Sequence, residues 1–196
     1  MNTKILNECP LVTVFEDFLD ADTCKKFIEY PWAWEKSTGY DHAEHRAKPT
    51  SHRTSSTTFI YENHKFYDFV AYTKAKISRT LKVRSQRFEF LQMQKYSSGE
   101  QYKHHHDYFF QGPEALNNRL GTVIIYLNDN FSGGETKFHK LGFSVTPKLG
   151  RALYFQYNYS PDENLLTEHS GEPIIEGEKF IVTAWFRKDN WSLDNK

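Results

Sequence analysis

The stretch KFIVTAWF, residues 179–186, alternates in character with the period of two that is typical of a β-strand. Successive side chains of a strand point to opposite faces of its sheet. One face is entirely apolar and consists of Phe180, Val182, Ala184 and Phe186. The other face consists of Lys179, Ile181, Thr183 and Trp185. We therefore expect the apolar face to pack on the hydrophobic core, and the other face to point either into a barrel or to solvent.

Lys179 gives the second face its chemical interest. If the apolar face packs on helices, the opposite face points into the barrel and buries the ammonium of Lys179. A buried ammonium is costly unless an anion meets it. The strand therefore predicts either an anionic ligand inside a barrel or a face that is exposed to solvent.

Shorter segments with the same period precede this strand, and turn residues separate them. The expected strands cover residues 11–15, 87–96, 102–110, 120–127, 135–139, 143–146 and 152–155. Two helices are expected before most of them. Asp20 stands at the cap position of a helix over residues 23–30. Apolar residues recur at three- and four-residue spacing between residues 63 and 81, which predicts a second, longer helix.

Helices followed by many short strands predict helices packed on one face of a double sheet, with a jelly roll or a barrel as the β part. The length of 196 residues favours a single domain over residues 1–196. The segment 31–56 is polar and irregular, which is typical of a lid or a binding loop. We expect this segment to be a mobile element.

The charge balance disfavours polyanionic partners. The chain carries 25 Lys and Arg against 25 Asp and Glu, so its formal net charge is zero. No field of the whole protein would attract nucleic acid or an anionic membrane, and we expect neither as a partner. Aromatic residues make up 16% of the chain, which argues for a folded globule and against disorder.

Two cysteines, Cys9 and Cys24, are too few for a scaffold built on disulfides. The N-terminal segment has Lys4, Glu8 and Pro10 where a signal peptide needs an apolar run. No apolar run approaches the length of a membrane span. We therefore expect a cytoplasmic protein.

Three adjacent histidines and an aspartate stand in YKHHHDYFF, residues 102–110. In a strand, His105 and Asp107 share one face. An imidazole and a carboxylate supply two corners of the 2-His-1-carboxylate site of non-haem iron, which needs a second histidine from elsewhere. A solvated, His-rich edge strand is the simpler explanation of this segment alone. A His104 and His106 pair follows the same alternation but lacks the carboxylate, and an all-nitrogen site suits ferrous iron less well.

His169 is the candidate for the second histidine, and Lys179 follows it by ten residues. The order of HxD at 105–107, His169 and Lys179 resembles the signature of iron(II)- and 2-oxoglutarate-dependent dioxygenases. The prolyl 4-hydroxylase family is the branch that the chain resembles, from about Pro10 to Trp185. The similar segments are KYSSGEQYKHHHDYF, RLGTVIIYLNDNFSGGETKF, VTPKLGRALYF, HSGEPIIEGEKFIVTAW and RTSS at residues 53–56.

The resemblance implies an α+β fold, a double-stranded β-helix (jelly roll) with N-terminal supporting helices. It implies that iron(II) is bound by His105, Asp107 and His169. The residues that would hold 2-oxoglutarate are Tyr96, Lys179 and Thr183, with Lys179 pairing with the distal carboxylate. The positions that face substrate in the family are Arg53, Ser55, Arg119 and Trp185. Without the resemblance, these aromatics would be core residues and these arginines surface charges.

The implied activity is hydroxylation of a C–H bond, in the first place of a proline residue in a peptide or protein. Succinate and CO2 would be coproducts, O2 the oxidant and ascorbate the reductant. A proline-rich peptide is a suitable guest, because it is already ordered as a polyproline II helix. Two alternatives stay open: the same chemistry on a free amino acid or other small molecule, and a non-catalytic jelly-roll module that binds a metal or ligand.

Overall fold

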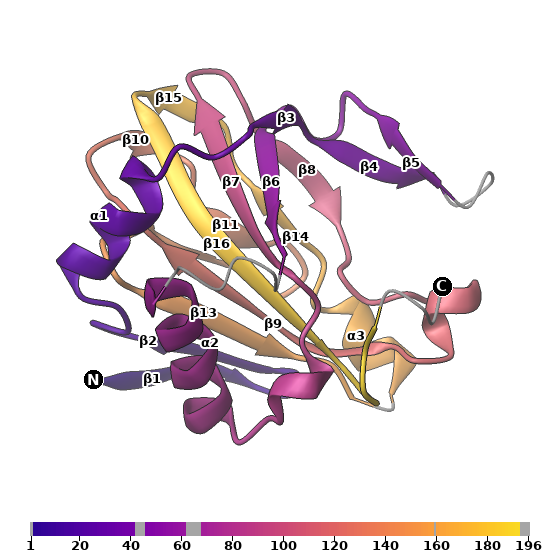
Figure 1. Ribbon diagram of the computed structural model, residues 1–196. Coiled ribbons are helices and arrows are strands. Elements are labelled where there is room, and N and C mark those ends of the chain that lie inside the picture. The colour runs from indigo at the N-terminus through magenta and orange to yellow at the C-terminus, as the bar shows by residue number, and fades with distance from the viewer. Residues whose placement is uncertain (1, 42–45, 62–67, 159, 193–196) are drawn as a thin grey trace.

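An eight-stranded antiparallel sheet forms the centre of the molecule (Figure 1). The computed structural model describes residues 2–41, 46–61, 68–158 and 160–192. The strands of this major sheet lie in the order β1–β2–β13–β9–β16–β7–β6–β3. Their bounds are Thr3–Glu8 (β1), Leu11–Phe15 (β2), Ala152–Gln156 (β13), Arg119–Tyr126 (β9), Glu178–Arg187 (β16), Leu91–Ser97 (β7), Ser56–Ile60 (β6) and Glu35–Lys36 (β3).

A four-stranded minor sheet faces the major sheet, in the order β12–β11–β14–β8. Its strands are Phe143–Val145 (β12), Thr136–Phe138 (β11), His169–Gly171 (β14) and Tyr102–His105 (β8). Two further strand pairs are Ser132–Gly133 (β10) with Ile174–Glu176 (β15), and Thr38–Asp41 (β4) with Arg46–Pro49 (β5). The helices are Ala21–Glu29 (α1), Asp68–Leu81 (α2) and Pro161–Leu165 (α3), with short 3-10 helices at Ser85–Arg87 and Pro113–Ala115.

The first helix forms for a local reason that the sequence contains. The Asp20 side chain accepts a hydrogen bond of 2.7 Å from the backbone N–H of Thr23, which satisfies one of the free donors at the helix start. The helix ends at Glu29, just before the Pro31 that disfavours helical backbone at the preceding residue. The predicted cap and helix are confirmed.

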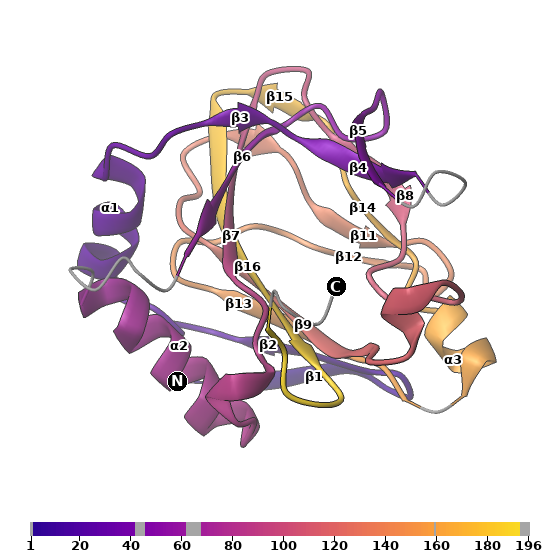
Figure 2. The same cartoon turned by 45° about the vertical axis from the view of Figure 1, so that its right-hand side comes forward.

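The two faces of the major sheet have different partners. Helices α1 and α2 cover one face, and the minor sheet lies on the other (Figure 2). The helix side holds a core that includes Phe27, Ile77, Val123, Val182, Ala184 and Phe186. The side toward the minor sheet holds a second core that includes Tyr96, Ile124, Tyr126, Phe138, Phe155 and Ile181. Because β16 contributes alternate residues to the two cores, its predicted two-faced character is confirmed.

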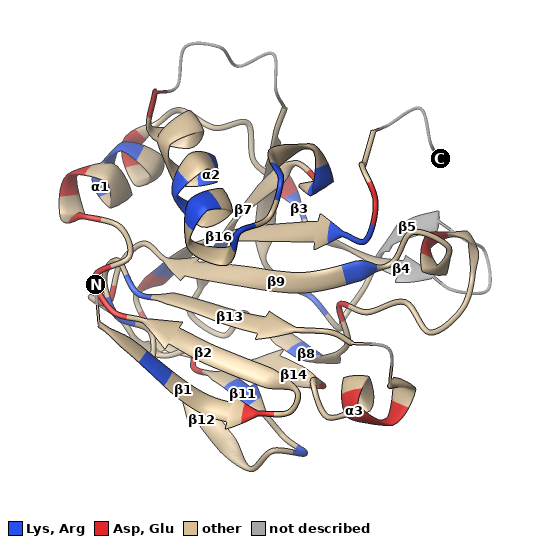
Figure 3. Ribbon diagram, turned by 90° about the horizontal axis from the view of Figure 1, so that it is seen from below, with Lys and Arg blue, Asp and Glu red and all other residues tan. Residues whose placement is uncertain are grey.

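Two facing antiparallel sheets with helices on the outer side constitute the α+β jelly roll, or double-stranded β-helix, that the sequence predicts. Charged residues gather on the helices and at strand ends, whereas β2 and β13 are drawn almost without charge (Figure 3). Among the described helices, none is long and apolar enough to cross a membrane.

The predicted strand over residues 102–110 is too long. Strand β8 ends at His105, and Asp107 lies in a bend beyond it. The reason is that a side chain replaces the strand partner at this point. Asn118 accepts a hydrogen bond from the backbone N–H of Phe109 at 3.1 Å and donates one to its carbonyl at 2.6 Å. Similarly, the strand expected from residue 87 begins at Leu91, after the 3-10 helix Ser85–Arg87.

The segment 31–56 is more regular than predicted. It contains β3 and the paired strands β4 and β5, in which Thr38 stands opposite Pro49. Its polar composition concealed these strands, because they lack the apolar alternation that identifies a half-buried strand. Residues 42–45 lie outside the described residues, and so does the start of the predicted second helix before Asp68. The mobility of this segment stays a prediction.

Candidate active site

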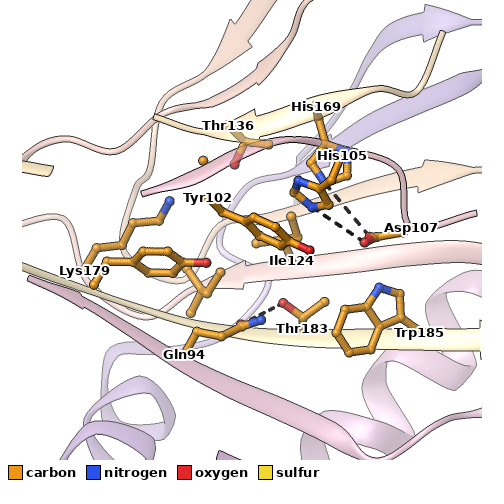
Figure 4. Close-up of a pocket in the computed structure, with 13 residues that line it drawn as sticks. Gln94, Tyr102, His105, Asp107, Ile124, Thr136, His169, Lys179, Thr183 and Trp185 are labelled. Atoms are coloured by element: carbon orange, nitrogen blue, oxygen red, sulfur yellow. Dashed lines mark hydrogen bonds and ion pairs between the residues drawn. The ribbon is translucent and has the colours of Figure 1, made fainter. Parts of the chain in front are cut away.

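A pocket lies between the major and the minor sheet, and Figure 4 shows its lining. Side chains alternate between the two faces of β16, and the face that contains residues 179, 181, 183 and 185 lines the pocket, as the sequence predicts. The minor sheet and the segment after β8 form the opposite wall. The lining residues are Gln94, Tyr96, Tyr102, His105, Asp107, Ile124, Thr136, His169, Gly171, Lys179, Ile181, Thr183 and Trp185.

Three side chains that can bind a metal meet in this pocket. The ligand atoms of His105, Asp107 and His169 all lie within 4.8 Å of one another, the one such group among the described residues. His105 and His169 stand opposite each other where β8 pairs with β14. The Nε2 atoms of His105 and His169 lie 3.7 Å and 4.0 Å from carboxylate oxygens of Asp107. Two imidazoles and one carboxylate are the ligand set of facial non-haem iron(II) sites.

Both histidines are held in the tautomer that a metal requires. The Nδ1 atom of His105 lies 2.8 Å from the carbonyl oxygen of Lys103, and that of His169 lies 2.9 Å from the carbonyl oxygen of Thr167. A carbonyl only accepts, so each Nδ1 carries the proton and donates it. Each Nε2 is therefore left with its lone pair directed toward the carboxylate of Asp107.

The charges of this group are balanced inside the protein. Burial alone would raise the pKa of Asp107, but the neighbouring His169, His105 and Arg119 outweigh it and hold the pKa well below its usual value. Burial, reinforced by His169, lowers the pKa of His105 well below its usual value. At neutral pH the site therefore offers a carboxylate and a neutral imidazole at His105, as metal binding requires.

His104 and His106 take no part in the pocket lining. The ring of His104 stacks on His139 with the ring centroids 3.7 Å apart. The Nε2 atom of His106 lies 3.7 Å from a carboxylate oxygen of Glu168. The structure thus brings together His105, Asp107 and His169, and leaves the alternative pair outside the pocket.

Lys179 also lies in the pocket lining, apart from the three metal-binding side chains (Figure 4). Its side chain is 2% exposed, and its Nζ donates a hydrogen bond of 2.6 Å to the carbonyl oxygen of Gly134. No carboxylate among the described residues forms an ion pair with it. Burial lowers the pKa of Lys179 to about 8. The charge of Glu135 acts against this shift, but it forms no direct ion pair with Lys179. A buried ammonium on a pocket wall without a direct ion pair among the described residues is the feature that the alternation of β16 predicts for an anion-binding site.

Gly134 makes room for this ammonium. It adopts a φ of +73°, and a Cβ atom there would stand 2.5 Å from the side chain of Ile174 and 3.2 Å from that of Lys179. Only glycine combines this backbone conformation with such a close approach. The double glycine at Gly133 and Gly134 therefore has a structural role beside Lys179.

The predicted cosubstrate residues Tyr96 and Thr183 both line the pocket. The Thr183 hydroxyl donates to the Oε1 atom of Gln94 at 2.9 Å, so its proton is already engaged. Thr136, which sequence reasoning missed, is better placed to donate. Its Oγ1 accepts a hydrogen bond of 2.7 Å from the Tyr126 hydroxyl, which leaves its own proton available. The SGGET motif contains this threonine, and only the fold reveals that its side chain reaches the pocket.

Trp185 and Arg53 each contain a buried donor without a hydrogen-bond partner among the described residues, Nε1 of Trp185 and Nε of Arg53. Trp185 lines the pocket and is 8% exposed. Arg53 is buried outside the pocket lining, donates from Nη2 to Gln92 at 3.0 Å, and lies 4.9 Å above the ring of Tyr102, which does line the pocket. The Trp185 indole also lies near Asp107, and its hydrogen bonding contributes to the low pKa of that carboxyl group.

Ser55 and Arg119 lie outside the pocket lining. The Ser55 hydroxyl is fully buried against that of Ser37, at 2.8 Å. Arg119 forms a bidentate ion pair with Glu89, at 2.7 Å and 2.8 Å, and lies 4.2 Å from the ring of Trp185. Its Nη1 also donates to the backbone carbonyl of Asp107 at 3.1 Å. Arg119 thus packs behind Trp185 and Asp107.

Comparisons with known proteins agree with this geometry. The 2OG-Fe(II) oxygenase superfamily matches residues 91–187. Probable prolyl 4-hydroxylase 10 of Arabidopsis thaliana is 31% identical over 97% of this chain and 73% of its own length.

Solved structures share the fold. A viral collagen prolyl hydroxylase from Paramecium Bursaria Chlorella virus-1, in complex with 2OG, superposes with a TM-score of 0.68 at 23% identity, over 90% of this chain and 95% of its own. A prolyl hydroxylase from Trichoplax adhaerens, in complex with a hypoxia inducible factor oxygen degradation domain peptide fragment, gives 0.67 at 14% identity, over 90% and 83%.

Proposed function

The chain belongs to the prolyl 4-hydroxylase family of the 2OG-Fe(II) oxygenase superfamily, and from this premise we propose that it hydroxylates proline residues in a peptide or protein. It is a 2-oxoglutarate-dependent dioxygenase, and its cofactors are iron(II) and 2-oxoglutarate. Iron(II), 2-oxoglutarate and O2 together supply the oxidising chemistry, with succinate and CO2 as coproducts and ascorbate as the usual reductant of the family.

We propose His105, Asp107 and His169 as the ligands of iron(II). Their donor set suits this metal, since it combines two imidazoles with one carboxylate and leaves open positions for reactants. The hydrogen bonds from both Nδ1 atoms to backbone carbonyls support the assignment, because they fix the Nε2 lone pairs toward Asp107. Asp107 and His169 are buried and His105 is half-buried, which restricts the access of bulk water to the reacting centre.

One observation carries the proposal for the cosubstrate: Lys179 is a buried ammonium without a carboxylate partner, in the same pocket as the three metal-binding side chains. A dicarboxylate with a keto group next to one carboxylate can bind the metal at one end and the ammonium of Lys179 at the other. Lys179 would pair with the distal carboxylate of 2-oxoglutarate, and Tyr96 and Thr136 would line the part of the pocket that holds this cosubstrate. This ion pair would offset the burial cost of the ammonium.

The two unpartnered donors support a proline-rich substrate. Proline residues have backbone carbonyls that accept hydrogen bonds but no N–H to donate. A site that recognises such a segment must therefore supply donors, and Nε1 of Trp185 and Nε of Arg53 are buried donors without partners among the described residues. The indole of Trp185 also offers the flat apolar surface that suits a proline ring. Arg119 would support Trp185 from behind.

We also propose that residues 1–196 form a single dioxygenase domain. The major sheet supports this, because it joins β1 and β2, near the start of the chain, to β16 near its end. A cytoplasmic location stays a prediction from the sequence.

The test is succinate formation from 2-oxoglutarate under air, with iron(II) and ascorbate, in the presence and absence of a proline-rich peptide. We expect turnover that depends on Asp107 and that rises when peptide is added, with hydroxyproline detected in the peptide by mass spectrometry. Turnover that no proline peptide stimulates would overturn the substrate proposal. A folded, iron-loaded protein that forms no succinate would contradict the proposed function as a whole.

A further inference from the structure

Asp107 has a hydrogen-bonded support that no predicted site residue supplies. The Thr122 hydroxyl lies 2.8 Å from Oδ2 of Asp107. The same hydroxyl lies 3.1 Å from the hydroxyl of Tyr157. Thr122 is fully buried on β9, and Tyr157, which follows β13, is 1% exposed. The side chains of Tyr157, Thr122 and Asp107 therefore form a buried chain of hydrogen bonds that ends at the carboxylate.

The direction of this chain follows from proton counting. A carboxylate only accepts hydrogen bonds, and Oδ2 of Asp107 lies at 2.8 Å from the Thr122 hydroxyl. The Thr122 hydroxyl therefore donates its one proton to Oδ2. Since that proton is engaged, the Tyr157 hydroxyl must be the donor to Thr122. Hydrogen bonds that run in one direction through a buried chain strengthen one another.

Fold position explains why these residues meet. In the pairing of the major sheet, Thr122 stands opposite Trp185 of β16 on one side and opposite Phe155 of β13 on the other. Alternation on β9 places Thr122 on the same face as Ile124, which lines the pocket. Tyr157 is anchored by its backbone N–H, which donates to the carbonyl of Leu120 at 2.9 Å.

Asp107 needs such support because it lies beyond the end of β8 and because a competing partner is near. Nη1 of Arg119 lies 3.9 Å from Oδ1 of Asp107. A carboxylate that was free to rotate could turn toward this guanidinium and away from the two histidines. The Thr122 hydroxyl fixes the plane of the carboxylate by holding Oδ2.

We propose that Thr122 and Tyr157 are positioning residues that orient the Asp107 carboxylate for the metal. This inference rests on the proposed role of Asp107 as an iron ligand. Removal of a group that hydrogen-bonds to a metal ligand typically lowers metal affinity by about 10- to 100-fold. The effect should be largest for Thr122, which touches the carboxylate, and smaller for Tyr157, which acts through Thr122.

Three substitutions separate the hydroxyl from the packing around it. Thr122→Val keeps the shape of the side chain but removes the hydroxyl, whereas Thr122→Ser keeps the hydroxyl and removes only a methyl group. Tyr157→Phe removes the donor at the far end of the chain. Mn(II), a redox-inert probe, is titrated under nitrogen into the metal-free proteins by calorimetry. Thermal unfolding of the same metal-free samples reports their structural integrity.

We expect Mn(II) affinity to fall about 10- to 100-fold in Thr122→Val and about threefold in Tyr157→Phe, with Thr122→Ser within about twofold of wild type. Equal affinity in wild type and Thr122→Val would overturn the inference and leave the proposed ligands intact. A loss in Thr122→Ser as large as in Thr122→Val would overturn it too, because packing would then explain the effect.

If Thr122→Val does not fold, Thr122→Ser and Tyr157→Phe decide the question. Unchanged affinity in Tyr157→Phe together with reduced affinity in Thr122→Ser contradicts the hydroxyl chain. A wild-type protein that binds no Mn(II) or Fe(II) would contradict the proposed function, and the inference with it.

Discussion

The metal-binding group and Lys179 are buried in the same pocket but differ in how their charges are balanced. The carboxylate of Asp107 accepts a hydrogen bond from Thr122 and lies near the guanidinium of Arg119, so its charge is compensated before any ligand binds. The ammonium of Lys179 has the carbonyl of Gly134 and the faces of Tyr96 and Tyr126, but no described carboxylate as an ion-pair partner. The protein itself therefore compensates the charge of Asp107, whereas the charge of Lys179 is compensated only when an anionic ligand binds.

This difference has a thermodynamic consequence. Where the protein compensates a buried charge, the same interactions support both the fold and the site. Where a ligand must compensate it, the unliganded protein carries the desolvation cost, and binding relieves it. We therefore expect function and stability to change together at Asp107 and in opposite directions at Lys179.

The largest expected effect is that of Asp107→Ala. Loss of the one carboxylate of the group should reduce succinate formation by more than about 100-fold. Substitution of residues that only hydrogen-bond to a metal ligand already reduces activity by up to about 100-fold, and loss of a ligand itself should cost more. Calorimetric titration with Mn(II) should show the loss of metal affinity directly. Activity within tenfold of wild type would show that another carboxylate serves the metal, and the comparison would fail at its first group.

Lys179→Met should weaken 2-oxoglutarate binding by about 100-fold, which corresponds to about 3 kcal/mol for a buried pair that loses its cation. The measurement is a titration of the Mn(II)-loaded protein with 2-oxoglutarate under nitrogen. Mn(II) affinity in the absence of 2-oxoglutarate serves as the control and should be unchanged. Equal affinity of the variant for 2-oxoglutarate would remove Lys179 from the cosubstrate site.

The affinity for 2-oxoglutarate should fall as the pH rises through about 8, the pKa to which burial lowers Lys179. Below this pH the ammonium is charged and attracts the anion, and above it the charge is lost, at up to about tenfold per pH unit. Lys179→Arg is the matched control, since a guanidinium stays charged throughout this range. A profile that is flat for wild type from pH 7 to 10 would contradict the role of the buried ammonium.

The same pKa predicts how stability depends on pH. The folded state releases the Lys179 proton at lower pH than the unfolded state, whose pKa is near 10.5. The unfolded state therefore binds more protons between about pH 8 and 10.5, so stability rises with pH in this window, by at most about 1.4 kcal/mol per unit. Below pH 8 the full cost of burial is present. Subtracting the profile of Lys179→Met isolates this contribution, and a zero difference would refute it.

The smallest expected effect is that of Trp185→Phe, which retains an aromatic ring but removes the unpartnered Nε1 donor. We expect KM for a proline-rich peptide to rise by about 3- to 10-fold, as for one lost hydrogen bond. Mn(II) affinity is measured beside it, because the Trp185 indole also contributes to the low pKa of Asp107. An unchanged KM for peptide would leave Trp185 as a packing residue of the pocket wall.

Local patterns carried much of the sequence-based prediction. The alternation in residues 179–186 predicts which side chains of β16 face the helices and which face the pocket, because this depends only on the strand geometry. The spacing of His105 and Asp107 predicts that both side chains lie on one face of a strand, but Asp107 lies beyond the end of β8. The structure brings them together through a bend after β8, whose position depends on the distant Asn118.

Residues whose importance depends on register escaped prediction. Thr122 is one of many threonines in strands, and its contact with Asp107 exists only because β9 lies beside β16 and β13. Thr136 reaches the pocket through the minor sheet in the same way. The strands β14 and β15 have only three residues each, too few for a period to be recognised, and their places are set by their partners.

The difference between the two groups is tested most directly by the unfolding free energies of the ligand-free proteins in urea at pH 7. We predict that Asp107→Asn lowers the free energy of unfolding by about 1–2 kcal/mol, because the fold stabilises this carboxylate. We predict that Lys179→Met raises it by about 1–2 kcal/mol, because an uncompensated buried charge is removed. Changes of the same sign in both variants, or a destabilised Lys179→Met protein, would contradict the account.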